Sequence, residues 1–298
     1  MHVIGRSASR PMNETLKADL QIKGPGLERS LSGVLDLYLE MGLDGTSIAI
    51  ANPTSRRFIA FEHWVSNDPG ETHFRSVLEN SELLQVADNF RKVVCSIKND
   101  RCIFVPEPLF DSQTVEEQLS ICFGPPHKFE ASGFDQLPIL SVVNCHYFQS
   151  SIHTTIGQRF KQAQFHHASS LRLLYMTSIA GPGKDSLVLV DIINESMQVT
   201  VVKASNLMFH NRFEFKTPEE LIYYLLLVFE QLHLNPETAD VFFTGDINKE
   251  NESFILAGKY ITNCRLSGLP SVYTYEPEFS FLDGSRFFNL FCGPLCVS

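Results

Sequence analysis

The chain has 298 residues, a length that suits two domains of ordinary size or one large one, and 44% hydrophobic residues are enough for a core. The net charge of −10 and the lack of a basic cluster argue against DNA or RNA as a partner. The first residues lack the apolar core of a signal peptide, and the longest apolar run has nine residues, too few to span a membrane, so we expect a cytoplasmic protein.

Residues 1–28 are polar and show no hydrophobic period, and Gly24-Pro25-Gly26 interrupts any regular element. We therefore expect a flexible N-terminal arm. The alternation of apolar and polar residues, with a strong turn signal at Asp44-Gly45, then predicts three strands and a helix. These elements are predicted over residues 35–41, 47–51, 57–65 and 71–90.

The rest of the first half alternates between strand and helix patterns. Strands are predicted over residues 93–97, 102–105, 139–143 and 162–165, and helices over residues 114–122, 145–157 and 168–177. Residues 180–184 read AGPGK, which is typical of a connecting loop. We place a boundary there, with a first unit at residues 29–180 and a second unit at residues 181–298.

The second half begins with three runs rich in Val, Ile and Phe, separated by turn residues. They predict strands over residues 187–193, 197–203 and 207–215. A helix should follow, because Thr217 can cap it, Pro218 suits its first position and Glu220 completes a capping box. The apolar run at 221–229 predicts that this helix is buried on most of its surface. The last predicted elements are a strand, a helix and a short strand, over residues 240–244, 250–261 and 263–266.

Both halves thus begin with three strands joined by turns and followed by a helix. A three-stranded antiparallel meander cannot come from a purely parallel doubly wound sheet, whose strands need crossovers. The predicted fold class is therefore α/β with mixed sheets. Two tandem units of this kind match the duplicated ribonuclease-H-like unit of the actin-like ATPase superfamily.

Three stretches of the chain also resemble one known family. They are FHHASSL at residues 165–171, FKTPEELIYYLLLVFEQL at residues 215–232 and FFNLF at residues 287–291. These stretches are similar to a bacterial family of uncharacterised proteins, domain of unknown function 3822, and the resemblance spans roughly residues 34–292. It implies an actin-like ATPase fold with no assigned activity.

In the actin-like superfamily, ATP lies between the two units and is held by two hairpin turns and an adenosine loop. In the first turn, Asp44 and Gly45 are suitable residue types, but the aspartate stands inside the turn, so we favour an ordinary hairpin. In the second turn, Asp191 is well placed near the end of its strand. The residues that follow it are bulky isoleucines and Glu195, which would block or repel a phosphate.

Gly245-Asp246 ends a predicted strand, at the place where the superfamily has the two glycines of its adenosine loop. Strand ends in such sheets face the ligand crevice, so the position is a candidate, but we favour a turn that caps the next helix. Residues 181–185 resemble the end of a P-loop, yet Asp185 stands where Ser or Thr must bind magnesium, so we interpret them as a linker.

Metal and catalytic sites have no support in the sequence. The adjacent His166 and His167 have no carboxylate or cysteine at ligand spacing, and Cys292 and Cys296 are best interpreted as half-buried apolar residues. The seven cysteines form no CxxC pair, which favours reduced thiols. We therefore predict no metal site and no catalytic residue.

The sequence favours a non-catalytic interaction or scaffold module with an eroded nucleotide site, acting through an unidentified protein partner. The alternative is an ATP-binding protein or weak ATPase that holds Mg-ATP with Asp44, Gly45, Asp191 and Gly245. A sugar- or metabolite-kinase-like enzyme ranks last, because no carboxylate base can be nominated.

Phenylalanines crowd the C-terminal region at positions 279, 281, 287, 288 and 291. Most should belong to the core. Any that stay exposed beside the helix at residues 221–229 would form an apolar patch of the kind that marks a protein interface.

Overall fold

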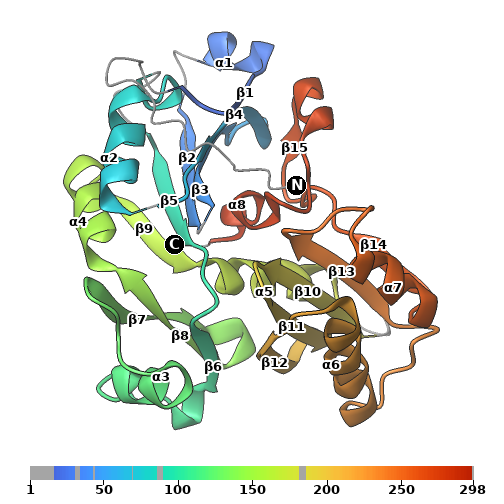
Figure 1. Ribbon diagram of the computed structural model, residues 1–298. Helices are drawn as coiled ribbons and strands as arrows, with labels where there is room; N and C mark the ends of the chain where they lie inside the picture. The colour runs from blue at the N-terminus through green and yellow to red at the C-terminus, as the bar shows by residue number, and fades with distance from the viewer. Residues whose placement is uncertain are drawn as a thin grey trace, which may run out of the picture.

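The computed structural model describes residues 17–30, 34–42, 44–68, 70–85, 90–180 and 186–296. Within these residues the strands form sheets of seven, five and three strands. Figure 1 shows the seven-stranded sheet above the three-stranded one, and the five-stranded sheet on the right. The fold class is α/β with mixed sheets, as predicted. In this part of the chain, no helix is both long and apolar enough to cross a membrane.

The seven-stranded sheet is built around the predicted meander of the first half. From one edge to the other it contains β1 (Leu20–Lys23), β4 (Arg57–Val65), β3 (Gly45–Asn52), β2 (Asp36–Gly42), β5 (Lys92–Ile97) and β9 (Ala163–His167), with β15 (Thr274–Tyr275) beside β4. The apolar residues of α2 (Glu71–Asn80) and α4 (Ser150–Arg159) pack against one face of this sheet. α5 (Ala168–Ile179) and α8 (Phe288–Phe291) pack against the other.

The predicted N-terminal arm is wrong in its last part. Residues 20–23 form β1, which pairs antiparallel with β4, and α1 (Pro25–Ser30) follows. No alternating strand pattern can be recognised in residues 20–23, because Ile22 is the only buried residue of β1. Residues 1–16 lie outside the described part of the chain. The helix predicted over residues 71–90 is also shorter, since α2 ends at Asn80.

The three-stranded sheet differs from the predicted elements in two places. Its strands are β6 (Cys102–Pro106), β8 (Val142–Gln149) and β7 (Glu130–Leu137), and α3 (Val115–Phe123) covers one face. The predicted helix at residues 145–157 is in fact the end of β8 followed by α4, because Val143, Cys145 and Tyr147 alternate toward α3. β7 was not predicted, since its sequence EASGFDQL is polar and contains a glycine.

The five-stranded sheet follows the sequence patterns closely. Its order is β12 (Asn206–Glu214), β11 (Ser196–Lys203), β10 (Leu187–Ile193), β13 (Asp240–Gly245) and β14 (Asn263–Leu266). α6 (Pro218–Gln231) and α7 (Glu252–Tyr260) cover one face. The predicted cap of α6 is present, because Thr217 Oγ1 accepts a hydrogen bond of 3.3 Å from the Glu220 amide. α6 is less buried than predicted: Leu221 and Leu225 are in the core, but Tyr223 is exposed.

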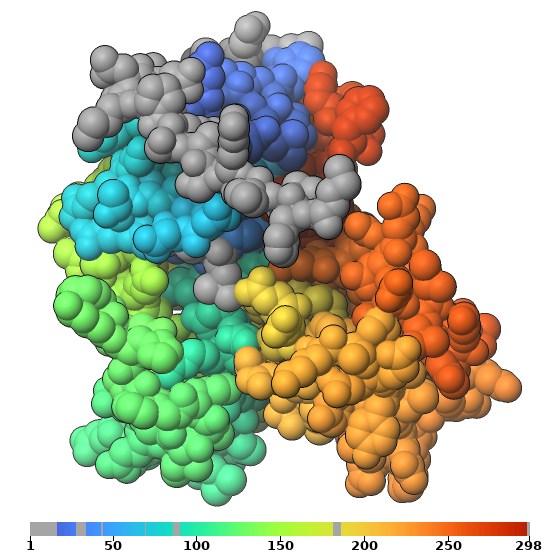
Figure 2. All heavy atoms as spheres, in the orientation of Figure 1, coloured from blue at the N-terminus to red at the C-terminus, as the bar shows by residue number. Residues whose placement is uncertain are grey.

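The two halves share one core. Side chains from the second half, such as Phe291, pack with Phe58 and Phe61 of β4, and β15 pairs in parallel with β4. Figure 2 shows atoms of the two halves meeting along a broad line on the face in view. The loop that we predicted as the boundary, residues 181–185, lies outside the described residues, so the division into two units there stays a prediction.

Candidate functional site

Strand geometry directs three charged side chains into the space between the seven- and five-stranded sheets. Side chains alternate along a strand, so Glu40 shares the face of Tyr38, and Asp191 shares the face of Leu189. Both of these faces belong to the core that contains α5 and α8. Lys98 directly follows β5 and is 5% exposed.

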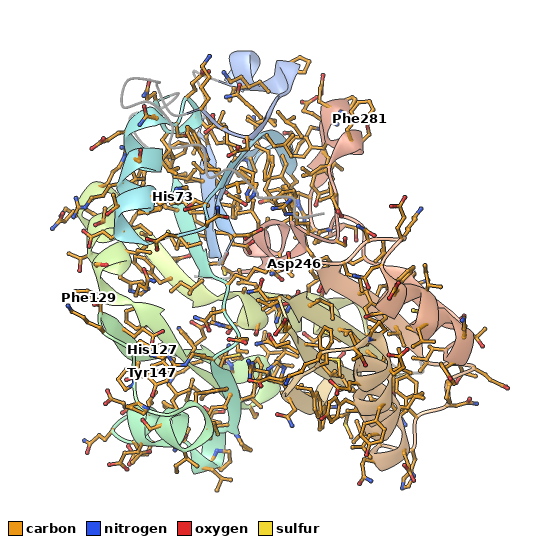
Figure 3. The ribbon with its side chains drawn as sticks, viewed as in Figure 1. His73, His127, Phe129, Tyr147, Asp246 and Phe281 are labelled. Atoms are coloured by element: carbon orange, nitrogen blue, oxygen red, sulfur yellow. The ribbon has the colours of Figure 1, made fainter. Side chains whose placement is uncertain are left out.

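The side chain of Lys98 is buried among acidic side chains of both halves. Burial alone would lower the pKa of Lys98, but nearby carboxylates outweigh burial and raise it. We call these residues the Lys98 cluster: Lys98, Asp191, Glu40, Asp44 and Asp246. Figure 3 shows Asp246 near the middle of the molecule, beside α8. The structure thus brings the two predicted turns and the end of β13 to one place.

Asp191 has no exposed surface, and both of its oxygens are already engaged. Oδ2 lies 2.7 Å from Nη1 of Arg172 in a buried ion pair, and Oδ1 accepts a hydrogen bond of 2.8 Å from the Thr244 hydroxyl. β10 and β13 are parallel and place Asp191 opposite Thr244. The charge of Asp191 is therefore neutralised from within the chain.

Arg172, like Lys98 and Arg286, was not predicted from the sequence. It lies on α5 and is 2% exposed. Its Nη1 donates to the side-chain oxygen of Asn289 on α8 at 3.2 Å, and its Nη2 donates to Gln198 on β11. Its Nη2 also donates to the Ser169 hydroxyl at 2.7 Å. An arginine inside the apolar run LRLLYM was the available signal, because a charge on a buried helix must have a buried partner.

The first turn carries Asp44 and Gly45. Arg286, from the C-terminal region, donates to Asp44 Oδ2 at 3.1 Å and lies 3.3 Å from Nε2 of His63. Burial would raise the pKa of Asp44, but Lys98 and the hydrogen bond from Arg286 lower it. Gly45 has a φ of +138°, and a Cβ there would lie 2.0 Å from the carbonyl oxygen of Trp64. The sheet itself therefore requires this glycine.

The second turn and the end of β13 are tied to each other. Gly245 has a φ of +86°, and a Cβ there would lie 2.0 Å from the carbonyl oxygen of Ile192. That oxygen accepts a hydrogen bond of 2.9 Å from the Asp246 amide, and Asp246 in turn accepts one of 3.4 Å from the Asn194 amide. The Asn194 amide therefore already has a carboxylate partner.

Two cavities lie near the cluster. One of about 100 Å³ is lined by Gly42, Lys98 and Asn99, among others. Small-molecule pockets usually measure about 300–1,000 Å³. A wider cavity of about 650 Å³ lies beyond the second turn, but Arg212 on its wall is already paired with Asp100 and Glu214. Among the described residues no group of three or more His, Cys, Asp and Glu could hold a metal ion.

The two adjacent histidines have different partners, and the two C-terminal cysteines are buried. His166 lies 3.4 Å from Asp135, whereas Nε2 of His167 lies 3.2 Å from the side-chain oxygen of Asn99. Burial would lower the pKa of His166, but the hydrogen bond with Asp135 helps to raise it to about 10. Cys292 and Cys296 are fully buried free thiols, where half-buried residues were expected.

Glu40 should make the stability of the protein fall as pH rises. Burial raises the pKa of Glu40 from 4.5 to about 7. Between these values the folded protein holds a proton that the unfolded chain has released, so stability is lost as pH rises through this window. The difference in unfolding free energy between Glu40→Gln and wild type should therefore favour the variant more at about pH 8 than at about pH 5. Urea unfolding at the two pH values measures this difference. The same difference at both pH values would contradict the assignment.

Solved structures share this fold. A protein from Bacteroides thetaiotaomicron VPI-5482, with an actin-like ATPase fold and unknown function, matches with a TM-score of 0.70 and 21% identity, covering 78% of this chain and 90% of that chain. The PilM–PilN type IV pilus biogenesis complex matches with a TM-score of 0.56 and 14% identity, covering 87% of this chain and 97% of that chain. The actin-like fold is therefore confirmed.

Sequence comparison places the chain in a family. No curated protein matches it. One family model, described as "Protein of unknown function (DUF3822)", matches residues 28–264. Because this match covers most of the chain and agrees with the resemblance of its three sequence stretches, the chain belongs to that family.

Proposed function

We propose that this protein is a non-catalytic module of the actin-like ATPase fold, which acts through a protein partner and has lost nucleotide binding between its units. The observation that carries the proposal is the buried pair of Asp191 and Arg172. An aspartate that places the waters of a bound metal must offer its oxygens to solvent. In this chain Arg172 and Thr244 occupy them.

The charge around the two turns supports the same proposal. A triphosphate bound beside Lys98 would lie in the field of the carboxylates of Asp44, Asp191 and Asp246. Like charges in a site of low dielectric repel strongly. The backbone amide of Asn194, which could donate to a phosphate, already faces Asp246. The Asn194 amide is therefore not free to offset this repulsion by donating to a phosphate.

Two further observations support a protein partner and a reducing compartment. The PilM structure that shares this fold is a complex with PilN. All seven cysteines are free, which suits the cytoplasm.

The second candidate function is ATP binding or weak ATPase activity. It is favoured by the position of Lys98, a cation placed among Asp44, Asp191 and the end of β13 at Gly245. An ammonium group there could meet a phosphate if the acidic side chains were neutralised by magnesium.

A thermal-shift titration with Mg-ATP and Mg-ADP separates the two functions. We expect no shift at millimolar nucleotide. A ligand at 100 times its Kd would add about 2.7 kcal/mol of stability, which is easily measured. A saturable shift that Lys98→Met abolishes would overturn the non-catalytic proposal.

A further inference from the structure

The outer side of α6 is apolar although it faces away from the core. Residues 221–229 of α6 are all apolar, and a helix that is apolar on all sides is normally buried on all sides. In the structure only one side of α6 packs against the five-stranded sheet. On the opposite side Tyr223 is 63% exposed, and Leu226 and Leu227 are half-buried. The core of this chain therefore does not account for the apolar residues on the outer side of α6.

α7 adds to this apolar face. The two helices pack against each other, and Figure 1 shows them side by side on the right of the molecule. Both cover the same face of the five-stranded sheet, so their outward side chains point in the same direction. Ile255 of α7 is 50% exposed. We call the outward apolar side chains of the two helices the α6–α7 surface: Tyr223, Leu226, Leu227 and Ile255.

The C-terminal phenylalanines do not contribute to this surface. Phe281 is 94% exposed but lies beside β1. The other four are buried: Phe279, Phe287, Phe288 and Phe291. The apolar patch beside residues 221–229 is therefore formed by α6 and α7 themselves.

Acidic side chains flank the α6–α7 surface. On α6, Glu219 lies one turn before the outward apolar side chains and Glu230 lies one turn after them, because residues three or four apart share a helix face. On α7, Glu252 lies one turn before Ile255. All three glutamates are exposed, and none of them takes part in an ion pair with another described residue.

Basic side chains are almost absent from the same two helices. α6 contains three glutamates and α7 contains one, whereas Lys259 is the single basic residue of the two. Between Lys216 and Lys249 the sequence has no lysine or arginine. The surface thus combines apolar side chains with negative charge that has no counter-charge within 4 Å among the described residues.

This charge decides between the possible occupants. A second copy of α6 would bring glutamates against glutamates in either direction, because Glu219 and Glu230 stand at both ends of the apolar face, and like charges oppose such a contact. The negative surface of a membrane would be repelled as well. An extended segment could not pair with α6 as a strand does, because the backbone groups of a helix bond to one another.

We infer that the α6–α7 surface binds a basic amphipathic helix of a partner protein. Apolar side chains three and four residues apart on the partner pack on the outward apolar side chains of α6 and α7. Lysine or arginine beyond them at each end meets Glu219 and Glu230, which lie about 16 Å apart along α6. About three turns of the partner helix match this length. Tyr223 is the anchor, because tyrosine supplies much of the binding energy where it becomes buried in an interface.

This inference rests on the proposed function in one respect, the protein partner, and adds the surface and the chemistry of that partner. The α6–α7 surface contains no residue of the Lys98 cluster. A basic helix that fails to bind would therefore leave the result of the nucleotide titration unchanged. A thermal shift with Mg-ATP would likewise leave binding of the helix unaffected.

Fluorescence anisotropy with the full chain tests the inference. The probe is a labelled peptide of about 20 residues that contains only leucine and lysine, with the leucines three and four residues apart. We expect saturable binding with a Kd below about 100 µM, which weakens as salt is added. A second peptide with the same leucines, but with glutamate in place of lysine, should not bind.

Tyr223→Glu should raise the Kd for the basic peptide about tenfold or more. The substitution adds a negative charge that by itself would attract the peptide, so the loss reports the apolar contact. Ile121→Glu is the matched control, since Ile121 is 85% exposed on another helix, α3. It should leave the Kd unchanged, and both variants should melt as wild type does because both side chains are exposed.

Removal of charge provides a second comparison. The double variant Glu219→Gln, Glu230→Gln should raise the Kd about fivefold at low salt. The double variant Glu116→Gln, Glu117→Gln removes the same charge from exposed positions of α3 and should leave the Kd within about twofold of wild type.

Three results would overturn the inference. The first is the lack of saturable binding of the basic peptide below about 100 µM, and the second is binding that Tyr223→Glu does not weaken. The third is a different occupant: a dimer of the chain, or binding to phosphatidylcholine vesicles, that Tyr223→Glu abolishes.

Discussion

Arg172→Met should lower the free energy of unfolding by about 3–5 kcal/mol. The substitution keeps most of the side-chain volume but leaves the carboxylate of Asp191 buried without its counter-charge. It also removes the hydrogen bonds from Arg172 to Asn289 and Gln198, which join α5 to α8 and β11. Urea unfolding at neutral pH measures the change.

Two controls separate the loss of this ion pair from a general effect of removing an arginine. Arg75→Met removes an exposed pair with Glu71 on α2 and should change stability by less than about 0.5 kcal/mol. The double variant Arg172→Met, Asp191→Leu removes both charges and should be clearly more stable than Arg172→Met alone. If Arg172→Met cost no more than Arg75→Met, the buried pair would not hold α5 against the five-stranded sheet.

Gly245→Ala should lower the free energy of unfolding by about 2–5 kcal/mol. The φ of +86° costs an L-residue about 1–2 kcal/mol, and overpacking commonly costs about 1–3 kcal/mol more. The added Cβ would lie 2.0 Å from the carbonyl oxygen of Ile192, in the turn where a phosphate would have to bind in the alternative function. Thermal and urea unfolding both report this loss.

Gly258→Ala is the matched control for that prediction. Gly258 lies in α7, and a Cβ there meets nothing within 4 Å. Alanine in a helix interior should stabilise the protein by about 0.5–1 kcal/mol. If Gly245→Ala were as stable as wild type, the glycine would not be required by the backbone. A role in contacting a ligand would then be the better explanation for it.

The fold could be predicted because local patterns of apolar and turn residues mark the strands of its two meanders. Leu187–Ile193 and Arg57–Val65 have the bounds that the sequence predicted, since their apolar residues are bounded by clear turns. β1 and β7 could not be found in the same way. Each depends on pairing with a distant strand, β1 with β4 and β7 with β8, and neither has an apolar pattern of its own.

The candidate site could be predicted only in part. The sequence pointed to Asp44, Gly45, Asp191 and Gly245, and the structure brings them together around Lys98. It did not point to Arg172 or Arg286, which reach Asp191 and Asp44 from α5 and from the C-terminal region. Contacts of this kind join residues far apart in the chain, so no local sequence pattern predicts them.

A crystal structure from crystals grown with millimolar Mg-ATP tests the proposed loss of nucleotide binding most directly. We expect that Arg172 still contacts Asp191, that Thr244 still donates to the same carboxylate, and that no nucleotide lies beside Lys98. A triphosphate bound between the two turns, with Arg172 displaced from Asp191, would contradict it.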